Sequence, residues 1–346
     1  MEYRTLGKTN LKVSEIGFGT WQLANDPGLW SGSTEEESLK CLRRYVELGG
    51  NFIDTAWIYG YSDNNPDCHP SEELIGKFLK ETGCRDKVII ASKIPPKNME
   101  WPAHQGILVS EIFPVEHIIR CVDESLKSLG VDYIDLMQFH VWQDYFINDS
   151  EWKEAIKSIS KSGKVKHWGI SINDYQPSNC FKTLDSGLFS VVQCIFNIFH
   201  QRPLETLFLS AKKNNVGIIA RVPLDEGGLS GKFNADTVFT TDDFRSQYFT
   251  KDRLIELGQR LEPLKKIAKE NNLTMTELDF KFILSSPEVS TVIPGMRKIE
   301  YVEQNNKYSD SKILSPEVVK ELAEHSWERN FYPNHDPMIV ESGYTE

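Results

Sequence analysis

Four polar residues stand at the ends of apolar, strand-like runs or in the loop after one of them, and their types suit proton transfer. One run ends in Asp54, and Tyr59 follows it five positions later; two further runs end at Lys93 and His140. A strand that ends in an acid and leads into a loop with a phenol is a common way to place a proton donor at the mouth of a barrel. The four side chains are therefore candidates for one catalytic site.

Each of these residues also has an ordinary structural explanation. An aspartate at the end of a strand often caps a turn, and Tyr59 could serve only in packing. Lys93 could be a solvated strand end, and His140 a hydrogen-bonded histidine of the core. The functional interpretation is favoured because all four residues occur in one regular order of strands.

The order of elements predicts what holds these residues. After a short hairpin, apolar runs alternate with amphipathic helices, which indicates a parallel sheet covered by helices. Eight such units in 346 residues fit a closed (β/α)8 barrel better than an open sheet. In a barrel, the active site lies at the carboxyl ends of the strands. The predicted strands comprise residues 16–21, 52–54, 88–93, 134–140, 168–171, 191–193, 216–220 and 291–293.

Capping residues mark several of the helices between these strands. Thr34 and Glu37 form a capping box, Ser71 and Ser150 are predicted to begin two further helices, and residues 115–129 form another. Further helices are expected near residues 205–213, 254–270 and 276–284. We predict one barrel domain over residues 1–346, with a hairpin at 1–15, extra C-terminal helices and a tail at 328–346.

Composition and charge limit the class of protein. Hydrophobic residues make up 40% of the chain and charged residues 26%, as in soluble globular proteins with a sizeable core. The formal net charge of −11 argues against nucleic acid or an anionic membrane as the main partner. No run is long enough to cross a bilayer, and the first residues lack an apolar signal segment.

The cysteines and histidines give no indication of a metal site. Six scattered cysteines lack C-x-x-C spacing, so we interpret them as reduced thiols of a cytoplasmic protein. A metal-dependent barrel hydrolase would need histidines and carboxylates clustered at strand ends, and only His140 qualifies. We therefore predict no metal.

Asp54, Tyr59, Lys93 and His140 resemble the catalytic tetrad of the aldo-keto reductase superfamily. The resemblance covers nearly the whole chain, because further motifs of that family follow in order. These motifs are Gly17-Phe18-Gly19-Thr20-Trp21, Ser71-Glu72-Glu73-Leu74-Ile75-Gly76, Asp135-Leu136-x-Gln138-x-His140, Gly163-Lys164-Val165, Gly169-Ile170-Ser171, Gln193 with Asn197, Pro223-Leu224 with Gly227 to Lys232, and Ile293-Pro294-Gly295 with Asn305.

The resemblance implies reduction of an aldehyde or ketone, sugars included, to an alcohol by hydride transfer. The alkoxide formed must be protonated, and Tyr59 would be the general acid in reduction and the base in oxidation. A free tyrosine, with a pKa of about 10, is a poor acid at neutral pH. The Lys93 ammonium would lower that pKa, and Asp54 would hold the ammonium in place. His140 would orient the substrate oxygen by a hydrogen bond.

The cofactor assignment rests on the resemblance, because the chain has no glycine-rich Rossmann loop. A nicotinamide cofactor would lie across the barrel mouth. Arg297 would pair with a 2′-phosphate, which favours NADPH over NADH; a basic helix start is the alternative. Arg221 stands where many family members stack an aromatic ring on the nicotinamide, and a guanidinium can also stack. The implied contacts are Thr20, Trp21, Asp54, Ser171, Gln193, Arg221, Val222, Pro223, Leu224, Gly231, Lys232, Gly295, Arg297, Gln304 and Asn305.

Tryptophans at strand ends suggest an apolar substrate pocket. They are Trp21, Trp57, Trp101 and Trp142, and core packing is the alternative for at least two of them. The long loop 94–114 and the aromatic tail residues 330–335 are expected to overhang the site.

Two functions from different classes stay open. The first is an NADP(H)-dependent reductase that acts on a small carbonyl compound. The second is a cofactor-binding regulatory or redox-sensing subunit with slow turnover, since the potassium-channel β subunits resemble the same family. The intact tetrad favours the enzyme. The sequence predicts no oligomeric state.

Overall fold

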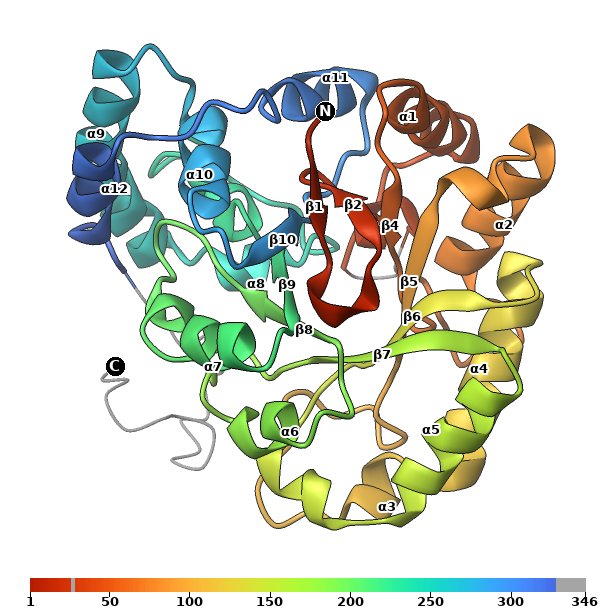
Figure 1. Ribbon diagram of the computed structural model, residues 1–346. Helices are drawn as coiled ribbons and strands as arrows, with labels where there is room; N and C mark the ends of the chain where they lie inside the picture. The colour runs from red at the N-terminus through yellow and green to blue at the C-terminus, as the bar shows by residue number, and fades with distance from the viewer. Residues whose placement is uncertain (26–28, 328–346) are drawn as a thin grey trace.

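The fold is a parallel eight-stranded sheet surrounded by helices, as the computed structural model of residues 1–25 and 29–327 shows (Figure 1). The strands lie in consecutive order from β3 to β10, and every neighbouring pair is parallel. They are β3 (Phe18–Gly19), β4 (Phe52–Asp54), β5 (Ile89–Ile94), β6 (Ile134–Phe139), β7 (Val165–Ser171), β8 (Val191–Ile195), β9 (Gly217–Arg221) and β10 (Val289–Val292).

The two edges of the sheet meet and close the barrel. The Gly17 amide donates to the Val292 carbonyl at 2.8 Å, and the Gly19 amide to the Pro294 carbonyl at 3.0 Å. A Cβ on Gly19 would lie 2.9 Å from the Ile293 carbonyl oxygen, so glycine is required for this approach. The predicted (β/α)8 barrel is confirmed.

Helices fill the connections between strands, as predicted. The helices between successive strands are α1 (Glu35–Glu47), α2 (Pro70–Thr82), α4 (Val115–Leu129), α5 (Glu151–Lys161), α6 (Phe181–Asp185) and α7 (Leu207–Lys213). The last crossover contains α8 (Arg245–Tyr248), α9 (Lys251–Glu270) and α10 (Met275–Leu284), and a short α3 (Val109–Ile112) lies in the loop after β5. After β10 come the expected C-terminal helices, α11 (Ile299–Lys307) and α12 (Pro316–Ala323).

Two of the three predicted caps differ from expectation. The Thr34 hydroxyl accepts a hydrogen bond from the Glu37 amide and caps α1, as predicted. By contrast, α2 begins at Pro70, and Ser71 lies inside its first turn with its hydroxyl directed to other hydroxyls. Ser150 precedes α5 but makes no side-chain capping bond. Local sequence predicted the starts of α1 and α5 and missed that of α2, while the side-chain partners depend on neighbouring elements.

The N-terminal hairpin closes the end of the barrel opposite to the strand carboxyl ends. Its strands, β1 (Tyr3–Thr5) and β2 (Lys12–Ser14), pair antiparallel around a single 3-10 turn. Leu6 and Val13 pack on the residues that point into the lower barrel. These residues are Phe52, Ala91, Leu136, Val191 and Ile219 on the strands and Ile293 directly after β10. The hairpin therefore seals an apolar floor.

Strand periodicity places a polar layer directly above this floor. Side chains two positions apart on a strand point to the same side, so each floor residue predicts an inward-facing residue nearer the mouth. Counting two positions on from the floor gives Asp54, Lys93, Gln138, Gln193 and Arg221. The alternation of side chains along the strands therefore places these polar side chains at the mouth of the barrel.

Two further predictions concern membrane-spanning helices and the C-terminal tail. Within residues 1–25 and 29–327, no helix is long and apolar enough to cross a membrane. The tail at 328–346, with its aromatic residues 330–335, lies outside the described residues, so its proposed position over the site stays a prediction.

Candidate active site

The tetrad residues converge at the barrel mouth from three neighbouring strands and one loop. The Lys93 ammonium lies 2.5 Å from the Asp54 Oδ2 and 3.2 Å from the Tyr59 hydroxyl. It also donates to the Thr55 carbonyl at 2.8 Å. The imidazole of His140, directly after β6, stands edge-on to the Tyr59 ring at 5.9 Å between centroids. A phenol, an ammonium, a carboxylate and an imidazole therefore share one site.

Two buried amides hold the Asp54 carboxylate from the opposite side. Gln193 Nε2 donates to Asp54 Oδ1 at 2.9 Å, and Gln138 Nε2 approaches the same oxygen at 3.3 Å. The carboxylate is almost fully buried, and the ammonium of Lys93 and these amide donors offset the cost of removing it from water. Sequence reasoning assigned Gln193 to the cofactor and gave Gln138 no role in the site. The sequence did contain a signal for Gln138, since it stands two residues before His140 and so on the same face of the strand.

Burial and charge set the protonation states of the tetrad. Burial raises the pKa of Tyr59 above its usual value because it outweighs the opposing charge of Lys93. Burial acts to lower the pKa of Lys93, but Asp54 and Tyr59 outweigh it and raise that pKa. The pair is therefore a phenol beside a fixed ammonium at neutral pH. The expected net lowering of the Tyr59 pKa is not found, since the sequence could not give its burial.

His140 is neutral over the same pH range. Burial, together with the charges of Lys93 and Arg221, holds the pKa of His140 well below its usual range. A neutral imidazole carries one N–H donor and one acceptor nitrogen. His140 can therefore hydrogen-bond a substrate oxygen without adding a charge to the site.

A cavity of about 880 Å³ opens from the tetrad and runs along the mouth of the barrel. Tyr59 and His140 line it, while Lys93 lies buried beneath. Arg297, Gln304 and Asn305 also line it. The cavity is large enough for a bound organic molecule of considerable size.

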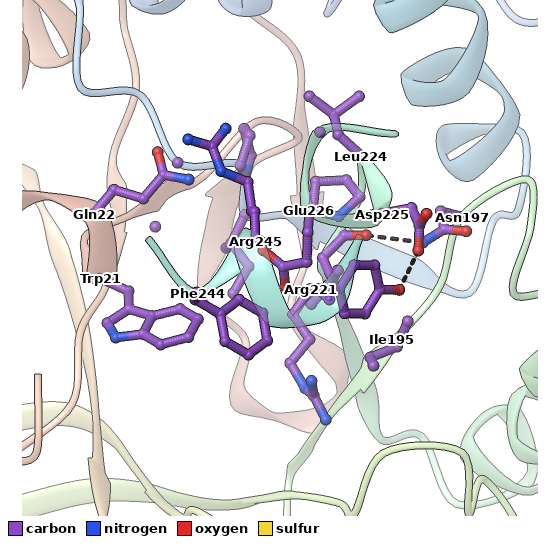
Figure 2. Close-up of a pocket in the computed structure, with 18 of the residues that line it drawn as sticks. Trp21, Gln22, Ile195, Asn197, Arg221, Leu224, Asp225, Glu226, Phe244 and Arg245 are labelled. Carbon is purple, nitrogen blue, oxygen red and sulfur yellow. Dashed lines mark hydrogen bonds between the residues drawn. The ribbon is translucent and has the colours of Figure 1, made fainter. Parts of the chain in front are cut away.

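Loops after β3, β9 and β10 line this cavity, and Figure 2 shows Trp21 of the first loop beside Phe244 of the second. The Phe244 amide donates to the Leu29 carbonyl at 2.9 Å, and Arg297 donates to the Ser31 carbonyl at 2.9 Å. The Trp21 ring lies 5.9 Å from the Phe244 ring. The segment after β9 is thereby joined to the segment after β3 across the cavity.

The sequence and the fold are similar to those of known proteins. The sequence profile of the Aldo/keto reductase family matches residues 15–326. The aldo-keto reductase YhdN of Bacillus subtilis is 31% identical over 301 residues, which cover 86% of each chain.

The chain belongs to the aldo/keto reductase family.

Two more members of the family show how far the likeness extends. The aldo-keto reductase yakc [NADP(+)] of Schizosaccharomyces pombe is 29% identical over 91% of this chain and 89% of its own. The structure of the aldo-keto reductase AKR11C1 from Bacillus halodurans, in its holo form, superposes with a TM-score of 0.72. It shares 25% identity and covers 97% of this chain and 99% of its own.

Most residues that the resemblance assigned to the cofactor line the cavity of this aldo-keto reductase. These are Thr20, Trp21, Asp54, Ser171, Gln193, Arg221, Val222, Pro223, Leu224, Lys232, Gly295, Arg297, Gln304 and Asn305. Gly231 is the exception: it is absent from the cavity wall and ends a 3-10 helix, η6 (Asp225–Ser230), in the left-handed conformation. Gly231 contributes through its backbone, because a φ of 73° is a conformation that glycine adopts readily.

The four tryptophans divide into two pairs. Trp21 and Trp101 line the cavity, and their rings lie 5.9 Å from the Tyr59 ring and 5.8 Å from the His140 ring, respectively. Trp57 and Trp142 are buried in the hydrophobic core instead, so the prediction that they line the pocket is wrong. Trp57 donates to Glu124 and Trp142 to Thr183, which directs both indoles toward the helices.

The loop after β5 forms one wall of the cavity, as predicted. Trp101 and Pro102 line the cavity, and Ala103 is held in place by Asn173. The Asn173 amide donates to the Ala103 carbonyl at 2.9 Å and accepts from the Ala103 amide at 3.1 Å. This loop is therefore a fastened wall beside His140.

Sequence reasoning missed a group of charged residues on the cavity wall. They are Asp174, Asp225, Glu226 and Arg253, and all four line the cavity. Asp174 follows directly after β7, so its position beyond a strand end was an available signal. The others stand in the long crossover, where sequence pattern gives no direction for side chains.

A buried glutamate behind the site makes the stability of the folded protein depend on pH. The Ser92 hydroxyl donates to Glu72 Oε1 at 2.5 Å, and Ser92 precedes Lys93 on β5. Burial raises the pKa of Glu72 from 4.5 to about 7. The folded protein therefore binds more protons than the unfolded chain between these two pH values, and stability falls as the pH rises through them.

We expect Glu72→Gln to remove this pH dependence. The parent should lose about 3 kcal/mol of unfolding free energy between pH 4.5 and pH 7 through this group, at about 1.4 kcal/mol per pH unit. Urea unfolding at pH 5 and pH 8 measures the difference between parent and variant. Glu81→Gln, on the exposed side of the same helix, is the control. Parallel stability curves for parent and Glu72→Gln would contradict the prediction.

Proposed function

We propose that this protein reduces an aldehyde or ketone to an alcohol with NADPH, with Tyr59 as the proton donor. The observation that carries the proposal is the chain of contacts from the Tyr59 hydroxyl through Lys93 to Asp54 at one end of the cavity. NADPH, when bound, supplies the hydride. The protein's own residues bind the substrate oxygen, exclude water and deliver the proton.

The cavity fits such a cofactor in size and in chemistry. Its volume of about 880 Å³ extends from the tetrad to Arg297, and Lys232 and Arg297 supply positive charge along it. One amino group of the Arg297 guanidinium is bonded to the Ser31 carbonyl, which fixes the side chain at the end where a 2′-phosphate would bind. A relative named for NADP(+) supports the preference for NADPH.

The proton step follows from the positions of three side chains. A carbonyl oxygen placed beside Tyr59 and His140 would accept a hydrogen bond from each. As negative charge develops on this oxygen, Tyr59 gives up its proton, and the adjacent Lys93 ammonium stabilises the phenolate. Asp54 keeps the ammonium charged and in place. In oxidation the same groups act in reverse.

The walls near the tetrad favour a substrate with an apolar part. Trp21 and Trp101 flank Tyr59 and His140, and Ile58 and Val141 complete this part of the wall. Sugars, aliphatic aldehydes and quinone-like carbonyls all belong in a substrate panel. A cytoplasmic location is part of the proposal and is supported by the six cysteines, all among the described residues and none in a disulfide bond.

The test is NADPH consumption with a panel of aldehydes, ketones and sugars, for the parent and for Tyr59→Phe. We expect turnover to fall by about 10²- to 10⁴-fold in Tyr59→Phe, because the ring stays while the proton is lost. NADH serves as the cofactor control. Tight NADPH binding without turnover in either protein would favour a regulatory subunit. Absence of binding to any nicotinamide cofactor would overturn the proposal.

A further inference from the structure

Arg221 faces the barrel mouth because of its register on β9. Ile219, two residues earlier, belongs to the apolar floor inside the barrel. Arg221 therefore points inward one layer higher, at the level of Asp54 and Lys93 on their strands. It lines the same cavity as Tyr59 and His140.

The guanidinium reaches across one strand to a fixed anion. Ile195 on β8 is the register partner of Arg221, yet the guanidinium bonds beyond it, to residues that follow β7. Its Nη2 donates to the Ile172 carbonyl at 3.1 Å and forms an ion pair with Asp174. The next strand along, β6, leads directly to His140. The cation is thus held over the mouth of the barrel, on the side of the segment that follows β7.

The charges around the proton donor come from several elements. Those that act on Tyr59 are Lys93, Asp54 and Arg221, and Arg221 lines the same cavity as Tyr59, with His140 neutral beside them. Those around Arg221 are Asp174, Glu226, Cys194 and His200. Of these groups, Lys93 and Arg221 are the cations near the phenol, and both act to lower the pKa of Tyr59 against its burial.

We infer that Arg221, positioned by Asp174, is a second fixed cation of the catalytic site and acts on proton transfer through Tyr59. The ion pair with Asp174 leaves the two side chains only 18% and 26% exposed, so solvent screens this cation less than a free surface arginine. Its effect is greatest when Tyr59 carries negative charge, which is the form that accepts a proton in oxidation. The kinetic part of this inference rests on the proposed function.

The alternative is a purely structural role, in which Arg221 only ties β9 to the loop after β7. A matched ion pair separates these two roles. Arg85 bonds to Asp135 at 2.9 Å with similar exposure, 19% and 11%, but lies before β5 and outside the cavity wall. Loss of either arginine removes a half-buried ion pair, while only Arg221 faces Tyr59.

The experiment compares Arg221→Met, Arg221→Lys and Arg85→Met in two measurements. The first follows tyrosinate absorbance with pH in the cofactor-free protein, as the difference between each protein and its Tyr59→Phe counterpart. The second is the pH profile of alcohol oxidation at saturating cofactor. We expect Arg221→Met to raise the pH at which Tyr59 titrates by about half to one unit. At pH values below this titration, alcohol oxidation should be about three- to tenfold slower.

Arg221→Lys keeps the charge and should recover at least half of this shift, while Arg85→Met should leave both measurements unchanged. An unchanged Tyr59 titration in folded Arg221→Met would overturn the inference, as would an Arg221→Lys protein that behaves like Arg221→Met. The proposed function fails differently, through parent turnover that does not depend on Tyr59. The titration needs no turnover, so the two failures are distinguishable.

Discussion

Replacing Lys93 by methionine is expected to lower turnover by about 10²- to 10⁴-fold and to destabilise the fold by about 3–5 kcal/mol. Turnover falls because Tyr59 loses the ammonium that stabilises its phenolate at 3.2 Å. Stability falls because Asp54, at 2.5 Å from the lost ammonium, is left as an unpaired charge within the barrel. Steady-state kinetics at saturating NADPH and urea unfolding measure the two effects.

A double variant separates the two contributions of Lys93. Asp54→Asn combined with Lys93→Met removes both charges and leaves an amide that Gln193 and Gln138 can still contact. We expect this protein to regain most of the lost stability while its turnover stays as low as that of Lys93→Met. Turnover of Lys93→Met within tenfold of the parent would contradict the assigned role of the ammonium.

Replacing Arg253 by methionine is expected to cost about 3–5 kcal/mol of stability and to weaken NADPH binding. Arg253 is buried, donates to Asp225 Oδ2 at 3.1 Å and lies 4.1 Å above the Trp327 ring. Its loss leaves Asp225 short of its cation, although the Tyr248 hydroxyl still donates to it at 2.5 Å. Asp225 begins η6 on the cavity wall, so we expect the dissociation constant for NADPH to rise.

Arg260 provides the matched control on the same helix. It also lies over Trp327, at 4.8 Å, but its guanidinium pairs with Glu256 at the surface, with 39% exposure. We expect Arg260→Met to cost no more than about 1 kcal/mol, because solvent screens an exposed pair. Urea midpoints and NADPH titrations of the two variants are to be compared. Equal midpoints for Arg253→Met and Arg260→Met would show that burial of the ion pair is not the source of the effect.

The positions of the catalytic side chains were readable from sequence because they depend on strand order and periodicity. Each of Asp54, Lys93 and His140 stands at or just after a strand end, and alternation along the strand decides which side chains point inward. The barrel then brings all strand ends to one mouth. Helix boundaries set by local chemistry, such as the Thr34 cap of α1, were likewise predictable.

Side-chain direction in the loops and partners across elements were decided only by the tertiary structure. Trp21 and Trp57 both follow barrel strands, yet Trp21 faces the cavity while Trp57 turns to Glu124 on α4. Ser71 looked like a cap, but hydroxyls of Thr20 and Thr55, from other segments, take its hydrogen bonds. Such partners come together only when distant segments pack, so no local pattern specifies them.

The protonation states of the site likewise depend partly on the sequence and partly on the tertiary structure. The sequence by itself determined which groups are present: a carboxylate, an ammonium and an imidazole at three strand ends, and a phenol in the loop after the first of them. Only the tertiary structure decided their burial, and burial outweighs the nearby charge to raise the pKa of Tyr59. It also brought Arg221 and Asp174 together across β8, because the guanidinium of a β9 residue is long enough to reach the loop after β7.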